Sequence, residues 1–459
     1  MFGFTSLALL AAASLLIGGT ATAADGGEAD NIWDALTQGK PTLNFRFRTE
    51  MANITNESGV GACAGVAAGC KTSWAMTART RLGYGTKPYK GVSAFVEMEN
   101  TAPIAKQLYF DGIGGAGANV NDLTPIPDPK STNLNQAYLK ITNKDLLDST
   151  IVGGRQRIIK DDARFIGNVG WRQNEQTYDA ASWNSTFNVD GLNFDYNYIW
   201  SVRRIFGTET IGTGAWNDFS ANTHLIHGSY DKLPVKITAF VYLTDISNGG
   251  TGATSAEANA NATYGLRLNG KHDFNDDWNI AYVASFAYQT DWADFDSNGA
   301  AAGGITQYNA MYWLGDAKVG FKPAGALGGG IEVLGSWNGE QGQWRFSTPL
   351  ATLHKWNGWA DVWLNNGGSA GLRDFFVYYE TPKMPWDLKG KAVFHYFKSD
   401  AGGDKQGWEI DGLLKKPINK HMDVLAKAAY YQAPDGGSAA VTGAQNDVVK
   451  VWLQTTIKF

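Results

Sequence analysis

The sequence contains no apolar run of membrane-helix length beyond residue 23, and its 459 residues include only 13 prolines and two cysteines. The first absence excludes a helical membrane protein, because a spanning helix needs about 20 apolar residues in succession. Two cysteines exclude a scaffold held together by several disulfides. The net charge of −5 excludes the basic surface of a nucleic-acid-binding protein, so we expect no nucleic-acid partner.

Aromatic residues and glycine are abundant instead, with 17 Trp, 19 Tyr, 22 Phe and 55 Gly. This composition favours many strands joined by turns. At the N-terminus, a short apolar run at Leu7–Ile17 is followed by Ala21-Thr22-Ala23, the small-residue pattern of a cleavage site. We therefore expect residues 1–23 to be a signal peptide. A membrane anchor is the weaker alternative, because the run is too short to span a bilayer.

The two cysteines, Cys63 and Cys70, lie seven residues apart in a stretch rich in Gly and Ala. An exported chain folds in an oxidising compartment, so we expect them to form a disulfide within a loop. No histidine lies nearby to complete a zinc site. The run Asn275-Asp276-Asp277 offers too few oxygen ligands for a calcium loop and is expected to be a hairpin turn. We expect neither a metal nor a cofactor.

Alternation of apolar and polar residues with a period of two is the main structural signal. From Leu43, apolar residues alternate with Asn44, Arg46, Arg48 and Glu50, as in a strand with one apolar and one polar face. Eighteen such segments follow one another along the chain. They are expected near 43–51, 74–84, 92–98, 134–142, 149–156, 176–187, 191–202, 221–231, 234–244, 262–273, 277–290, 308–321, 329–338, 372–381, 388–397, 407–415, 421–431 and 447–459.

The connections between these segments alternate strictly between short and long. Bacterial outer-membrane barrels have this asymmetry, because their periplasmic turns are tight and their extracellular loops are long. An open sheet edge would leave unpaired backbone groups in lipid, so strands of this kind must close into a barrel. The sequence thus predicts an all-β fold, a single transmembrane antiparallel β-barrel of about 18 strands. It would occupy residues 43–459, preceded by a short periplasmic segment at 24–42.

The last strand alternates up to the aromatic terminal residue Phe459. A terminal Phe on such a strand resembles the signal read by the barrel assembly machinery, which we expect to be a partner of the chain. Outer-membrane lipid and lipopolysaccharide are the other expected partners. We expect the barrel to be a monomer.

Two motifs resemble the alginate-export family of outer-membrane porins. The first is Gly154-Arg155-Gln156-Arg157-Ile158 continuing to Asp179, and the second is Thr352-Leu353-His354-Lys355-Trp356-Asn357-Gly358-Trp359-Ala360-Asp361 with Gly371-Leu372-Arg373-Asp374. The resemblance implies an 18-stranded monomeric barrel whose narrow lumen bears arginines and conducts anionic polysaccharide or smaller solutes. It does not specify the substrate.

Alternation assigns a set of charged side chains to the lumen. Arginine is suited to binding carboxylates because its planar guanidinium donates two parallel hydrogen bonds. Rings of cationic side chains also select anions in pores. The predicted pore-lining residues are Arg46, Arg48, Arg79, Arg81, Lys140, Arg155, Arg267, Glu97, Glu99, Asp179 and Asp374. For any one of them, pairing with a neighbouring strand is an equally good interpretation.

Two long connections have compositions unlike plain solvent-exposed loops. Residues 157–175 are basic, and residues 339–371 contain Trp344, Trp356, Trp359 and Trp363, so both are expected to fold into the mouth or lumen. The predicted residues of these pore loops are Arg157, Arg164, Arg172, His354, Trp356, Trp359 and Asp361.

These patterns predict a porin for passive diffusion of small polar or anionic solutes, such as sugar acids or oligosaccharides. The first alternative is a dedicated export channel for alginate or another anionic exopolysaccharide. A less favoured alternative is a barrel hydrolase, since none of the six histidines lies in a nucleophile motif. We therefore expect no catalytic residue. The predicted location is the outer membrane of a Gram-negative bacterium.

Overall fold

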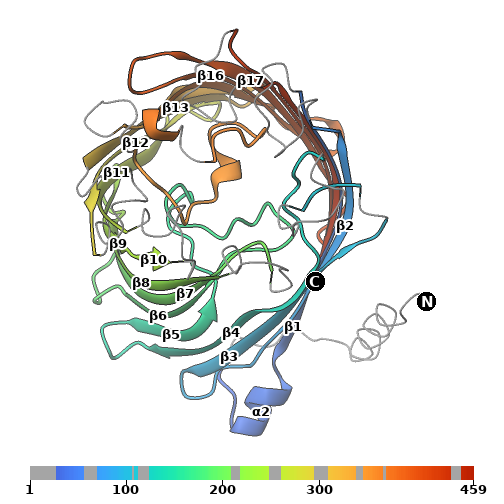
Figure 1. Cartoon of the computed structure of the whole chain (residues 1–459). Coiled ribbons are helices and arrows are strands. Elements are labelled where there is room, and N and C mark those ends of the chain that lie inside the picture. Colours follow the sequence, from blue (N-terminus) through green and yellow to red (C-terminus); the bar gives the residue numbers. More distant parts are fainter. Residues whose placement is uncertain are drawn as a thin grey trace.

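The computed structural model describes residues 27–55, 70–105, 108–111, 123–207, 218–247, 260–293, 309–336, 345–364, 368–435 and 446–459. These residues form one antiparallel sheet that curves into a closed barrel (Figure 1). A short helix, α2 (Ile32–Thr37), precedes the first strand, with the Asn31 side chain capping its N-terminus. In the described part of the chain, no helix is both long and apolar enough to span a bilayer.

The barrel wall has 18 strands. The strand segments are β1 (Lys40–Ile54), β2 (Ser73–Gly85), β3 (Val92–Pro103), β4 (Ser131–Asn143), β5 (Ser149–Gln156), β6 (Thr177–Ser185), β7 (Leu192–Arg203), β8 (Asp218–Tyr230), β9 (Lys236–Thr244), β10 (Ile246–Ser247), β11 (Asn261–Asp273), β12 (Trp278–Asp291), β13 (Asn309–Phe321), β14 (Gly325–Leu334), β15 (Leu372–Glu380), β16 (Lys389–Lys398), β17 (Lys405–Pro417), β18 (Met422–Gln432) and β19 (Val448–Lys458). Both β9 and β10 pair with β8 on either side of Asp245, so they are two parts of one wall strand.

Each wall strand pairs with its neighbours in the chain, and β1 closes the barrel by pairing with β19. Closure leaves no sheet edge for lipid to meet. The alternation is visible in the burial of β2, where Trp74 is 52% exposed on the outer face and Arg79 is 1% exposed on the inner face. Apolar side chains therefore face outward and polar ones inward, as the period-two pattern predicts.

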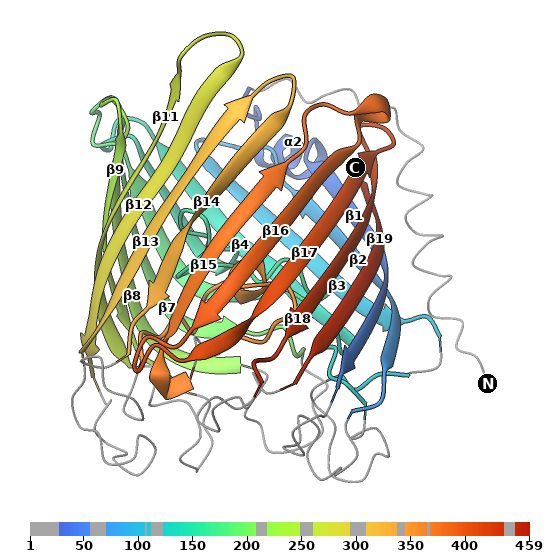
Figure 2. The same cartoon turned by 90° about the horizontal axis from the view of Figure 1, so that it is seen from above.

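The chain turns tightly at one end of the barrel, where the C-terminus also lies (Figure 2). Three of these short turns use the same device: the side-chain oxygens of Asn143, Asn275 and Asn419 accept backbone N–H groups two and three residues further along. An asparagine in this position substitutes for a backbone turn. The turn expected at 275–277 is confirmed.

The predicted fold class and strand number are confirmed. The largest displacement is in β14, which was expected at 329–338 and runs from Gly325 to Leu334. Its first half is rich in glycine, so alternation could not fix where it begins. Residues 1–26 lie outside the described part of the chain, so the signal peptide stays a prediction. Cys63 also lies outside it, and the pairing of Cys63 with the buried Cys70 stays a prediction as well.

Candidate functional site

Two segments that leave the wall at the end opposite the short turns lie inside the barrel. They are residues 157–176, between β5 and β6, and residues 345–364, between β14 and β15 (Figure 1). The segments also bind each other. The N–H of Gly167 donates to the carbonyl of Leu350 over 2.8 Å, and the N–H of Thr352 donates to Ala163 over 2.9 Å. We call residues 157–176 the first arm and residues 345–364 the second arm.

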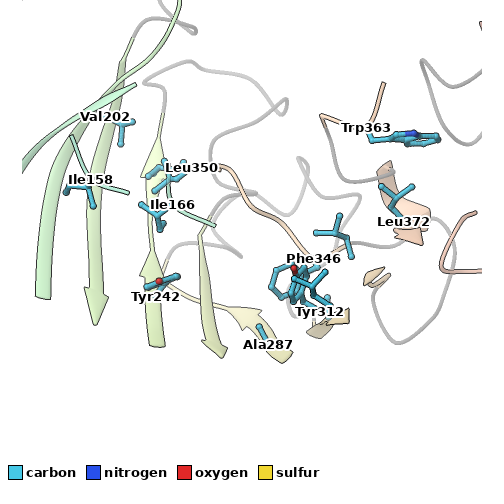
Figure 3. Packing of buried hydrophobic residues seen from close by; sticks show 14 of the residues in the cluster. Ile158, Ile166, Val202, Tyr242, Ala287, Tyr312, Phe346, Leu350, Trp363 and Leu372 are labelled. Carbon is cyan, nitrogen blue, oxygen red and sulfur yellow. The ribbon is translucent and has the colours of Figure 1, made fainter. Parts of the chain in front are cut away.

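Apolar packing holds both arms against the inner wall. From the first arm, Ile158 and Ile166 belong to the same buried cluster as Val202 and Tyr242 of the wall (Figure 3). From the second arm, the Phe346 ring lies 5.4 Å from that of Tyr312 on β13. Burying each large side chain contributes about 1.5–3 kcal/mol. This packing explains why two long connections fold inward.

Two of the predicted pore arginines bind the backbone of the first arm. The Arg46 guanidinium donates to the carbonyls of Gly170, Trp171 and Arg172 over 3.0–3.2 Å. Arg48 donates to the Trp171 carbonyl over 2.6 Å, and its guanidinium carbon lies 4.1 Å from the centroid of the Trp171 ring. These side chains hold the arm against β1.

Of the four arginines that β1 and β2 direct into the lumen, two lie close to a carboxylate that neutralises their charge. Arg81 pairs with Glu99 at 2.5 Å, and Arg48 lies 3.6 Å from Asp128. Arg46 and Arg79 face each other directly in the β1–β2 register. Among the described residues, neither forms an ion pair with a carboxylate.

Arg79 is the less satisfied member of that facing pair. Its Nη2 donates to Asn44 over 2.6 Å, whereas its Nε and Nη1 have no hydrogen-bond partner among the described residues. Its side chain is almost fully buried. Two facing guanidiniums without a carboxylate leave a local excess of positive charge on this wall.

The carboxylate of Asp361 joins the two arms to each other and to the wall. It accepts from Arg172 of the first arm at 3.0 Å, from His354 Nδ1 of the second arm at 2.6 Å, and from Lys450 of β19 at 2.7 Å. All four side chains are buried. We call this group the Asp361 hub. Burial alone would raise the pKa of Asp361, but the adjacent His354 Nδ1–H and the positive charge of Lys450 hold it well below its usual range.

Lys427 of β18 lies next to this hub, between the aromatic rings of both arms. Its ammonium lies 4.1 Å from the ring centroid of Trp171 and 3.9 Å from that of Trp359. It also lies 2.7 Å from Nε2 of His354. An ammonium can only donate, so the His354 proton is on Nδ1, facing Asp361. Burial lowers the pKa of His354, which agrees with a neutral ring.

A second buried carboxylate, Glu175, fixes the base of the first arm. It accepts from Arg157 Nε at 2.9 Å, from Asn135 at 2.6 Å and from Asn168 at 2.7 Å, and it lies 3.4 Å from Arg81. Burial alone would raise the pKa of this carboxyl. The Arg81 and Arg157 charges and the hydrogen bonds outweigh burial and lower the pKa to about 2.

Between the arms and the wall of β13–β18 lies a cavity of about 600 Å³. Its lining combines charges of both signs with aromatic rings. Acidic residues are Asp161, Asp162, Asp316, Glu332 and Asp374; basic residues are Arg164, Lys355, Lys391 and Lys427; aromatic residues are Trp171, Trp356, Trp359, Phe376, Tyr378, His354 and His395. Neither sign of charge dominates this lining.

Arg164 is central to the polar wall of this cavity. It binds Glu332, lies 3.3 Å from Asp162, and stacks 3.6 Å over the Trp356 ring. Asn357 donates to both Glu332 and Asp374, at 2.9 and 3.2 Å. The second arm is thereby fixed to strands β14 and β15 as well.

The remaining predicted lumen residues divide into two groups. The first group points inward as predicted. Arg267 binds Asp162 at 2.8 Å, and Glu97 accepts a hydrogen bond from Asn135 at 2.7 Å. Lys140 is exposed on the inner face of β4. Arg155 and Asp179 pair with each other at 2.7 Å, but the register puts Arg155 on the same face as the outward Ile151. This placement differs from the sequence prediction, because Gly153 and Gly154 left the phase of β5 undefined.

Two contributors to the site were not predicted. Residues 123–130 pass along the inner face of the wall, where Asp128 accepts the N–H of Gln173 at 2.8 Å. No alternation marks this stretch. Lys427 does alternate inward on β18, so its direction was available from the sequence, but its contacts with both arms were not. Among the described residues, no group of three or more His, Cys, Asp or Glu is arranged to hold a metal ion.

Comparisons with known proteins identify the fold and no family. No family model matches the chain, and no curated protein matches it. Solved structures do: OccAB2 of Acinetobacter baumannii aligns with a TM-score of 0.61 and 13% identity, covering 92% of this chain and 98% of that one. OccK9 (OpdG) of Pseudomonas aeruginosa aligns with a TM-score of 0.61 and 13% identity, covering 93% and 100%.

A third similar structure is the outer membrane protein opdK from Pseudomonas aeruginosa, with a TM-score of 0.60 and 12% identity over 92% of this chain and 99% of that one. Identities this low support the shared fold alone. The alginate-export resemblance has no support from these comparisons. A closed barrel with an apolar outer face, similar to a known outer-membrane protein, places the chain in the outer membrane of a Gram-negative bacterium.

Proposed function

We propose that the chain is a porin for small polar or anionic solutes, narrowed by its two arms. The observation that carries this proposal is the cavity of about 600 Å³ that the arms leave inside a closed barrel. Its volume lies within the range of cavities that hold one compact organic solute. Charges of both signs beside aromatic rings suit a solute with hydroxyl and carboxylate groups, such as a sugar acid.

The preference for anions is supported by the facing pair of Arg46 and Arg79. Arg48 and Arg81 are offset by carboxylates, so they add little to the field in the lumen. Arg46 and Arg79 are not offset in this way. Arg46 is only half-buried, so the positive potential of the pair extends to the solute path.

Export of alginate or another anionic polymer is the second candidate, favoured by the two motifs in the arms. A polymer must thread continuously past both arms, whereas a small solute can pass through the space between them and the wall. The Asp361 hub fastens the arms to each other and to β19. Passive diffusion of small solutes is therefore the proposal, and polymer export is tested against it.

The experiment reconstitutes the purified barrel in planar bilayers and measures the reversal potential in a salt gradient. We expect a preference for anions that declines in Arg79→Gln. Arg373→Gln is the matched control, because Arg373 is half-exposed and paired with Asp400 at 2.9 Å. A clear preference for cations in the wild type would overturn the anion proposal. If the reconstituted barrel shows no conductance, the proposal that it is a channel is overturned.

Liposome swelling distinguishes the two candidate functions. We expect vesicles containing the barrel to swell in glucuronate and glucose, and to respond little to alginate oligomers of increasing length. Permeation by long oligomers at a rate similar to that of glucuronate would favour the polymer channel instead.

A further inference from the structure

Residues 27–39, including α2, lie outside the barrel wall at the end with the short turns. Figure 1 shows α2 outside the ring of strands beside β1 and β3, and Figure 2 shows it at the level of the C-terminus. Because short turns face the periplasm in barrels of this kind, this is the periplasmic end. The segment was expected simply to be periplasmic.

Hydrogen bonds hold the segment against the outer face of the wall. Tyr84, which alternates outward on β2, donates to the carbonyl of Leu36 at 2.6 Å and accepts from the N–H of Gly39 at 2.9 Å. The Ala35 carbonyl accepts from Lys87 at 3.0 Å, and Ala29 donates to Pro88 at 2.7 Å.

The close approach to the wall requires glycine at position 39. A Cβ added there would lie 2.4 Å from the carbonyl oxygen of Gly85 and from the Tyr84 ring. The segment is thus fitted to the wall and does not hang free from β1.

The side of α2 turned away from the barrel is apolar. Trp33 is 72% exposed, Ile32 is 65% exposed and Leu36 is 52% exposed, whereas Ala35 packs toward the wall. Exposure of three large apolar side chains to water is unfavourable, and a lipid environment would remove that cost. The neighbouring outward residues Val92 and Val96 of β3 are also exposed and belong to the lipid-facing surface. The apolar side of α2 therefore continues that surface.

We propose that α2 is an interfacial anchor, inserted through Ile32, Trp33 and Leu36 into the phospholipid leaflet on the periplasmic side of the outer membrane. An amphipathic helix lies in the boundary between headgroups and acyl chains with its apolar side buried, and tryptophan favours the same depth. The hydrogen bonds to Tyr84 and to the 87–88 turn fix the helix at the periplasmic rim of the wall. The anchor orients the barrel from its periplasmic rim.

The test attaches an environment-sensitive nitrobenzoxadiazole label to Trp33→Cys in the full-length barrel. Wild type treated with the same label is the check on the native cysteines. The protein is reconstituted in phosphatidylethanolamine and phosphatidylglycerol vesicles whose acyl chains carry bromine near the headgroup. Asp276→Cys is the water-facing control, because Asp276 is exposed in the 274–277 turn at the same end of the barrel. Met98→Cys on the outer face of β3 is the lipid-facing control.

We expect bromolipid to quench the label at position 33 at least about twofold more than at position 276, approaching the value at position 98. Aqueous iodide should show the reverse order. Equal quenching by bromolipid at positions 33 and 276 would overturn the proposal. A label at position 33 shielded from both quenchers would also overturn it, because a protein partner or second copy would then cover the helix. Heat-modifiable migration of each variant verifies that the barrel is folded.

Discussion

The two sides of the lumen use similar inward charges for different purposes. On the side of β1–β4, arginines and carboxylates are bound by the first arm, and most are buried within a network of protein contacts. On the side of β13–β18, inward side chains such as Asp316, Tyr378 and Lys391 line an open cavity. Alternation directs a side chain inward, but the arms decide whether it meets solute or protein. Apart from the Arg46–Arg79 pair, whose positive potential is proposed to reach the solute path, loss of a charge should therefore affect arm docking on the first side and solute passage on the second.

The largest effect is expected from Asp361→Asn, which removes the charge shared by both arms. Arg172 and Lys450 would lose their common partner, and breaking a buried ion pair in this way costs about 3–5 kcal/mol. We expect the arms to detach and the single-channel conductance to rise. Asp387→Asn is the control, because this exposed carboxylate lies away from the arms and pairs with Lys383 at 3.2 Å. Equal conductance in wild type and Asp361→Asn would show that the hub does not hold the arms.

At low pH, protonation of Glu175 should detach the part of the first arm that joins the wall. Its pKa in the folded protein is about 2, below the ordinary 4.5, so its contribution to stability is complete above about pH 4.5 and is lost as the pH falls toward 2. Protease cleavage within residues 157–176 should therefore begin only below pH 4.5. Glu175→Gln should already be cleaved at neutral pH. If the wild type loosens between pH 7 and 5, another group controls the arm.

Lys427→Met should have a smaller effect on arm docking than Asp361→Asn. The substitution removes the contacts of the ammonium with Trp171 and Trp359, each worth about 2 kcal/mol when desolvated. It also removes the cost of burying a charge, which offsets part of that loss. We expect more frequent openings to the high-conductance state, measured in single-channel recordings. Openings more frequent than in Asp361→Asn would reverse the order of importance of the two residues.

The smallest structural effect is expected from Lys355→Gln, on the cavity side. Lys355 is exposed and donates to the carbonyl of Asp162 at 3.0 Å, so arm stability should change by less than about 0.5 kcal/mol. Uptake of glucuronate by liposomes should fall while uptake of glucose stays constant. A rise in conductance like that of Asp361→Asn would mean that this side also anchors the arms.

The sequence predicted the wall better than the contents of the lumen. Period-two alternation and the short turns gave all 18 strands, because each strand must present one face to lipid and one to a polar interior. The same pattern predicted that Arg48 points inward. It could not show that Arg48 binds the Trp171 carbonyl, because such contacts depend on how an irregular segment packs. The bounds and the inward faces of the glycine-rich strands β5 and β14 were the hardest to predict. Glycine is neither clearly apolar nor polar, so it does not mark a position as facing lipid or the lumen.

The closing pair of strands has a consequence for biogenesis. Residues Asn44 and Lys458 are neighbours in the register of β1 with β19, and the backbone of Phe459 exchanges hydrogen bonds with Leu43. The first and last strands of the chain are therefore partners, and contacts this distant in sequence form late and slowly. The barrel cannot close until β19 has been synthesised and secreted. Until then, another protein must shield the unpaired edge strands of the incomplete sheet, because exposed edges promote aggregation.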